Sequence, residues 1–232
     1  MEKQNQISFF NKFIKQIKKG VKNVGIITDK DGTILLDQDL RNTLERFREK
    51  NLGASIYLIA NSGRTVKDMV NSLEAENIPT HYFDYIVGDN GSMCVDVKRN
   101  KQLYKHTIDK NIVKQVIDEF VRMGGNIQDV RYADGNGIYV CKTEEVQEYY
   151  KNRRNINFKD HIEDLEGVDI TKLTLVGSHE LINQINKYIR ENIKGYKTHM
   201  GKTTFPTKDS DNYRMDFTRN AYKRFCSKEI KK

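Results

Sequence analysis

Residues 26–33 of this 232-residue chain read Ile-Ile-Thr-Asp-Lys-Asp-Gly-Thr, and this stretch decides the fold. Its apolar first half is typical of a buried strand, and the carboxylates of Asp29 and Asp31 follow where that strand ends. Open α/β sheets bind their ligands at this edge. One carboxylate there can attack an electrophile such as phosphorus, while the other protonates the leaving group and then activates water. A common Asp-Gly turn is the alternative, but a strand that leads directly into the acid pair favours a catalytic role.

A second polar segment follows the next predicted strand, at residues 55–60. The 61–65 loop reads Asn-Ser-Gly-Arg-Thr, and a helix is predicted to begin immediately after it. A hydroxyl group and exposed N–H groups at a helix N-terminus can bind phosphate. The alternative is a simple helix cap in which Ser62 or Thr65 accepts from backbone N–H groups. The position of the loop, one crossover after the acid pair, favours phosphate binding.

The first ninety residues alternate between apolar strands and amphipathic helices. Strands are predicted at 24–28, 55–60 and 85–87, with helices at 39–51 and 65–77 between them. This order predicts parallel strands joined by right-handed crossovers, as in one half of a doubly wound sheet.

The pattern changes after Asn90-Gly91, where strands come in pairs with helices among them. A hairpin is predicted over 93–104, followed by these elements: a helix at 111–123, strands at 127–133 and 137–142, a helix at 144–152, a strand at 173–176, a helix at 179–193 and β-rich pieces to 217. Such an arrangement predicts an α+β unit that differs in style from the first half.

These motifs together resemble the haloacid dehalogenase superfamily of phosphatases, specifically its Cof-like, type IIB group. The resemblance implies an α/β fold, in which an α+β cap is inserted into a Rossmann-like core with a doubly wound parallel sheet. The expected organisation is an N-terminal amphipathic helix at 1–20, the first part of the core at 21–107, the cap at 108–205 and an incomplete return to the core at 206–232.

The resemblance also implies catalytic and metal-binding roles for the first motif. Asp29 would be the nucleophile and Asp31 the general acid and base of a reaction that passes through an aspartyl-phosphate. The Asp29 carboxylate and the Asp31 carbonyl would hold Mg²⁺.

Five further residues are implied to contact the substrate. Ser62, Gly63 and Arg64 match a Ser-Gly-Arg variant of the second motif, and Asn90 matches the Asn-Gly step just before the cap. Lys223 is the best match to the third-motif lysine, which neutralises charge on the phosphoryl group.

The chain departs from the family pattern after Lys223. The fourth motif, an acid pair of the Gly-Asp-x-x-x-Asp type, should follow this lysine, but the sequence given stops nine residues later at Lys232. Asp209 and Asp211 resemble such a pair superficially, yet they precede the lysine. We therefore expect a chain truncated at its C-terminus, with a weakened metal site and a sheet edge that a second copy or a partner chain covers.

Two functions stay open at this point. The first is a Mg²⁺-dependent phosphatase that acts on a small phosphorylated metabolite such as a sugar phosphate and is impaired by loss of the fourth motif. The second is a degenerate, non-catalytic relative that binds a phosphate ligand or a protein partner.

Composition excludes several other classes of protein. The formal net charge is +8 and is concentrated at both ends, which suits an anionic substrate; no nucleic-acid-binding motif accompanies it, so no nucleic-acid partner is expected. Cys94, Cys141 and Cys226 form neither a zinc pattern nor a disulfide framework, which indicates a reducing cytoplasm. No apolar run is long enough to span a membrane.

The amphipathic segment 7–18 is expected to pack on the protein's own core, with binding to a membrane surface as the alternative.

Overall fold

The computed structural model describes residues 22–29, 55–125, 127–132, 137–141, 167–203 and 212–219, together with positions 15, 20, 42 and 49. Over 127–132 and 137–141 the description is of the backbone. The predicted helices at 7–18, 39–51 and 144–152 lie largely outside these residues.

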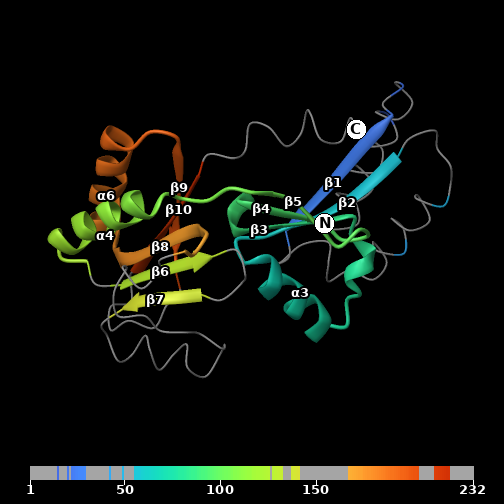
Figure 1. Ribbon diagram of the computed structural model, residues 1–232, viewed down its shortest axis with the longest axis horizontal. Helices are drawn as coiled ribbons and strands as arrows, with labels where there is room; N and C mark the ends of the chain where they lie inside the picture. Colours follow the sequence, from blue (N-terminus) through green and yellow to red (C-terminus); the bar gives the residue numbers. More distant parts are fainter. Residues whose placement is uncertain are drawn as a thin grey trace, which may run out of the picture.

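The first sheet has five strands in the order β1 (Asn23–Asp29), β2 (Ser55–Asn61), β3 (Tyr85–Gly88), β4 (Met93–Asp96) and β5 (Lys101–Lys105). Strands β1, β2 and β3 are parallel, and β4 and β5 add an antiparallel hairpin. Helix α3 (Val66–Ala75) and the short turn η2 (Thr80–Tyr82) connect β2 to β3, and η3 (Asp89–Gly91) connects β3 to β4. This arrangement confirms the predicted α/β fold class and parallel strands (Figure 1).

Strand β1 buries one of its two faces and leaves the other exposed. Ile26 is buried and packs in one cluster with Met69 and Leu73 of α3. The next side chain, Ile27, lies on the opposite face because side chains alternate along a strand, and it is 55% exposed. Among the described strands, β1 forms one edge of the sheet.

The second sheet also has five strands, in the order β7 (Gly137–Cys141), β6 (Ile127–Tyr132), β8 (Ile170–Ser178), β10 (Asn212–Arg219) and β9 (Tyr196–Lys202). All neighbouring strands are antiparallel. Helices α4 (Lys110–Arg122) and α6 (His179–Asn192) accompany it. The predicted α+β arrangement of strands and helices is confirmed, although β8 begins three residues before the strand expected at 173–176.

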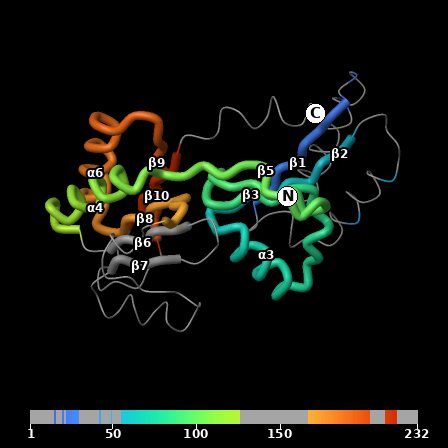
Figure 2. Tube along the Cα trace, in the orientation of Figure 1, coloured from blue at the N-terminus to red at the C-terminus, as the bar shows by residue number. Residues whose placement is uncertain are grey.

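The helices pack on one face of this second sheet, as Figures 1 and 2 show. The shared core combines residues of α4, α6, β8 and β10: Val113, Val116, Phe120, Ile182, Ile185, Ile189, Leu173, Leu175, Met215 and Phe217. Strand alternation therefore places the polar residues between them on the other face. These are Lys172, Thr174, Asp216 and Thr218, and all four are buried.

The two sheets and their helices lie next to each other along the long axis of the molecule (Figure 1). Hydrogen bonds join the polar face of the second sheet to the loops that follow β2 and β3. None of the helices in the described residues is long and apolar enough to cross a membrane.

Candidate active site

The candidate nucleophile lies where the sequence predicted it, at the C-terminal end of a parallel strand. Asp29 is the last residue of β1, and its side chain is exposed. It pairs in register with Asn61, the last residue of β2. The structure therefore brings Asp29 and the 61–65 loop to the same edge of the sheet. Asp31 lies outside the described residues.

Ser62 is buried, and hydrogen bonds of its backbone fix its position. Its N–H donates to the carbonyl of Val87 at 3.0 Å, and its carbonyl accepts from the N–H of Asn90 at 3.3 Å. The Ser62 hydroxyl oxygen accepts from the N–H of Arg64 at 3.1 Å. Within the described part of the chain, the hydroxyl proton of Ser62 and the N–H of Gly63 have no acceptor. Both can donate to an anion.

Thr65 has the capping role that was the alternative for this loop. It is the N-cap of α3, and its hydroxyl oxygen accepts from the N–H of Asp68 at 3.0 Å. The preceding carbonyl, that of Arg64, accepts from the N–H of Asp89 at 2.7 Å. The loop thus combines a capped helix at one end with unused donors at Ser62 and Gly63.

Asn90 connects this loop to the second sheet. Its backbone is left-handed, with φ 53°, a conformation that asparagine tolerates better than most residues. Its side-chain amide donates to Asp216 Oδ2 at 2.9 Å. A Cβ atom on Gly63 would lie only 2.9 Å from Asn90 Oδ1, so glycine is what lets the loop approach this side chain. The predicted substrate-binding residues Gly63 and Asn90 are therefore neighbours.

Sequence reasoning missed the contribution of the second sheet to this site. Lys172 Nζ donates to the carbonyl of Gly63 at 2.6 Å, and Thr171 Oγ1 donates to Asp89 Oδ2 at 2.8 Å. The sequence predicted that this strand starts at residue 173, so both side chains were expected to lie outside it. The available signal was the polar pair Thr171-Lys172 between Ile170 and Leu173, at the start of an apolar strand.

Asp216 is a second buried acid of this interface, besides Asp89, and it is 3% exposed. Its second carboxylate oxygen, Oδ1, accepts from Thr174 Oγ1 at 2.7 Å. Burial by itself raises the pKa of Asp216, whereas the positive charges of Lys172 and Arg214 lower it. Together with the hydrogen bonds from Thr174 and Asn90, they hold this pKa below its usual value. Asp216 is therefore ionised at neutral pH.

The oxygen atoms at the edge of the first sheet are ligands of the kind that Mg²⁺ prefers, but the described residues do not complete a metal site. The exposed carboxylate of Asp29 offers the oxygen ligands that Mg²⁺ prefers. The described residues contain no group of three or more His, Cys, Asp or Glu side chains that could hold a metal ion. The other expected ligand, Asp31, lies outside them, as do the third-motif candidate Lys223 and the acids Asp209 and Asp211.

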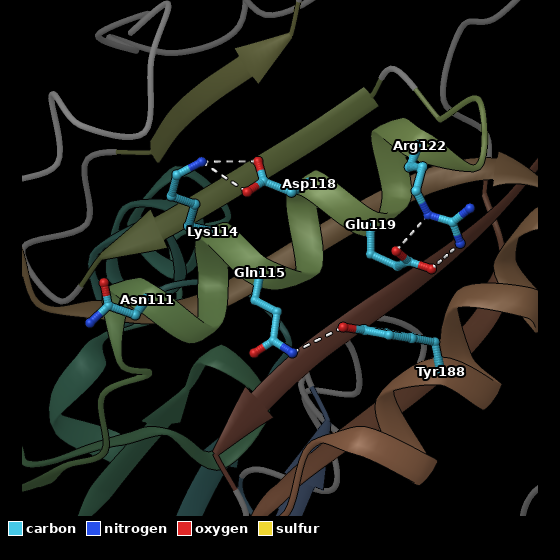
Figure 3. Close-up of a pocket in the computed structure, with 7 residues that line it drawn as sticks. All are labelled: Asn111, Lys114, Gln115, Asp118, Glu119, Arg122 and Tyr188. Carbon is cyan, nitrogen blue, oxygen red and sulfur yellow. Dashed lines mark hydrogen bonds and ion pairs between the residues drawn. The ribbon is translucent and has the colours of Figure 1, made fainter.

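A separate hollow of about 400 Å³ lies on the outer side of helices α4 and α6 (Figure 3). Its polar side chains pair with one another: Lys114 with Asp118, Arg122 with Glu119, and Gln115 with Tyr188. None of the residues that line it is a predicted site residue. Because its charges already neutralise each other, this hollow offers a phosphate ester no free cation.

Comparison with known proteins places the chain in a family. Residues 26–220 match the haloacid dehalogenase-like hydrolases. The chain belongs to this family of hydrolases. The match covers most of the chain and includes both the first motif and the region expected to form the cap, so the resemblance inferred from the motifs is confirmed. A search of curated proteins found no match.

Solved structures similar to this hydrolase share its fold at low sequence identity. A phosphatase of the superfamily from Bacteroides thetaiotaomicron has a TM-score of 0.60 and 16% identity, over 86% of this chain and 67% of that chain. A haloacid dehalogenase-like hydrolase from B. subtilis has a TM-score of 0.60 and 14% identity, over 86% and 73%. A subclass IIB sugar phosphatase has a TM-score of 0.56 and 16% identity, over 86% and 70%.

Proposed function

We propose that this hydrolase is a Mg²⁺-dependent phosphatase that acts on a small phosphorylated metabolite such as a sugar phosphate. The observation that carries the proposal is the register of β1 and β2, which puts Asp29 beside the start of the 61–65 loop. The nucleophile and the unused donors of Ser62 and Gly63 thereby share one edge of the sheet. Similarity to a subclass IIB sugar phosphatase supports the substrate class.

The proposed reaction has two steps. A carboxylate oxygen of Asp29 attacks phosphorus, and the bond from phosphorus to the ester oxygen breaks as Asp31 protonates that oxygen. Asp31 then takes a proton from water, which attacks the aspartyl-phosphate, releases inorganic phosphate and restores the Asp29 carboxylate.

Three other groups position the phosphoryl group in this proposal. Ser62 and Gly63 donate hydrogen bonds to its oxygens, and Lys223 offsets its charge. Magnesium held by the Asp29 carboxylate and the Asp31 carbonyl would supply further positive charge at the reacting group. A cytoplasmic location, and a second copy or partner chain over the β1 edge, belong to the same proposal.

The test is release of inorganic phosphate from an aryl phosphate and a panel of sugar phosphates, with Mg²⁺ or with EDTA. Asp29→Asn should lower kcat by at least about a thousandfold, since it removes the nucleophile. Asp118→Asn, which removes an exposed acid on α4, should leave kcat unchanged. Full activity of Asp29→Asn would remove Asp29 from its role. Phosphate binding by the wild-type protein without any hydrolysis would favour the non-catalytic alternative.

A further inference from the structure

Lys172 is a buried cation that the second sheet delivers to the candidate active site. It lies on β8, on the face opposite α4 and α6, and is 7% exposed. Its ammonium group reaches the carbonyl of Gly63, 109 positions away in the sequence, at 2.6 Å. The neighbouring residue Ser62 carries the hydroxyl proposed to bind phosphate.

The hydrogen-bonding capacity of this ammonium group is mostly unused. A lysine side chain has three N–H donors. Within the described part of the chain, the Gly63 carbonyl is the one acceptor that Lys172 meets, and no carboxylate lies within ion-pair distance of it. The buried acid nearby, Asp216, already accepts from Asn90 and Thr174. The charge of Asp216 lies near Lys172, but a buried ammonium group with a single hydrogen-bond acceptor is under-satisfied, so the arrangement suits an additional anion.

We propose that Lys172 binds the phosphate group of the ligand together with Ser62 and Gly63, as a positive charge supplied by the second sheet. This inference rests on the proposed function, because it takes the 61–65 loop to be the phosphate site. It adds a residue that the first, second and third motifs do not contain. Phosphate affinity then depends on both halves of the molecule, since Ser62 follows β2 and Lys172 lies on β8.

The test is calorimetric titration of the full chain with inorganic phosphate, for wild type, Lys172→Gln, Lys172→Arg and a control. The control is Lys187→Gln, which removes the same charge from an exposed position on α6. Lys172→Gln should weaken phosphate binding about 10- to 100-fold, as expected for a hydrogen bond to a charged group. Lys172→Arg should recover most of the affinity, and Lys187→Gln should not differ from wild type.

A second measurement on the wild-type protein does not depend on how well Lys172→Gln folds. In protein labelled with ¹⁵N-lysine, the Lys172 ammonium resonance is the one that disappears in Lys172→Arg. It should shift during phosphate titration, with the midpoint found by calorimetry. A resonance that stays unchanged at saturating phosphate would show that the lysine only holds the Gly63 carbonyl.

Measurements of phosphate binding and of ester hydrolysis test this inference and the proposed function separately. Wild-type affinity in Lys172→Gln overturns the role of Lys172, while hydrolysis by the wild-type protein leaves the phosphatase proposal intact. Failure of the wild-type protein to bind phosphate also overturns the role of Lys172. Loss of phosphate binding in Lys172→Gln supports the inference whether or not the wild-type protein hydrolyses esters.

Discussion

The side-chain amide of Asn90 donates to the carboxylate of Asp216 across 2.9 Å, although the two residues are 126 positions apart. Asn90 follows β3 of the first sheet, and Asp216 lies in β10 of the second. Thr174 donates to the other carboxylate oxygen, so both oxygens of this buried acid are hydrogen-bonded. The two halves of the molecule are therefore joined by a buried charged group.

Replacing this acid by its amide, Asp216→Asn, should lower the thermal midpoint by roughly 4–16 °C. The amide nitrogen cannot accept a hydrogen bond, and Lys172 loses a nearby negative charge. Breaking such a buried arrangement costs about 2–4 kcal/mol, and a chain of this size loses about 2–4 °C per kcal/mol. Calorimetric melting at pH 7 measures the change. A melting curve identical to that of wild type would mean that the ionised form of Asp216 does not stabilise the fold.

The stability of the wild-type protein should also fall in acid because of Asp216. Its pKa is lowered in the folded state, so the unfolded chain binds a proton at a higher pH than the folded chain does. The stabilisation is complete above the unfolded-state pKa of about 3.9 and is lost as the pH falls through the lower folded-state value. Melting curves recorded from pH 7 to pH 2.5 give the difference in stability between wild type and Asp216→Asn. This difference should be constant above about pH 5 and should shrink below pH 4. A constant difference down to pH 2.5 would contradict this assignment.

Local patterns were sufficient to predict the three parallel strands of the first sheet and the position of Asp29 at the end of one of them. The apolar runs at 24–28, 55–60 and 85–87 lie in β1, β2 and β3, because parallel strands in α/β proteins are rich in apolar residues. Asp29 and the 61–65 loop then had to meet, since parallel strands carry their C-terminal ends to the same edge.

The contacts between the two sheets could not be predicted in the same way. Lys172 and Gly63 are separated by 109 positions, and nothing in either local segment specifies the other. Lys172 looked like a polar residue before a strand, whereas it lies within β8, where it is nearly buried. The burial of Lys172 depends on how the two sheets pack together, and the periodicity of the strands carries no information about that packing.

A single methyl group at residue 63 should disturb the candidate site. In Gly63→Ala, the new Cβ would lie 2.9 Å from Asn90 Oδ1, and this side chain cannot move without weakening its bond to Asp216. The substitution should destabilise the protein by about 1–3 kcal/mol and weaken binding of inorganic phosphate. Gly201→Ala is the matched control, because a Cβ there meets no atom within 4 Å. Equal melting points and phosphate affinities for the two variants would show that the close approach of Gly63 to Asn90 is unimportant.

Thr171 allows the contact between the halves to be tested without changing any charge. Its hydroxyl donates to Asp89 Oδ2 at 2.8 Å, and Asp89 is fully buried. Thr171→Val keeps the shape of the side chain but removes that donor, which should cost about 1–3 kcal/mol because a buried carboxylate loses a hydrogen bond. Thr171→Ser retains the hydroxyl and should recover most of the thermal midpoint. Equal losses in the two variants would show that packing of the methyl group, and not the bond to Asp89, is what Thr171 contributes.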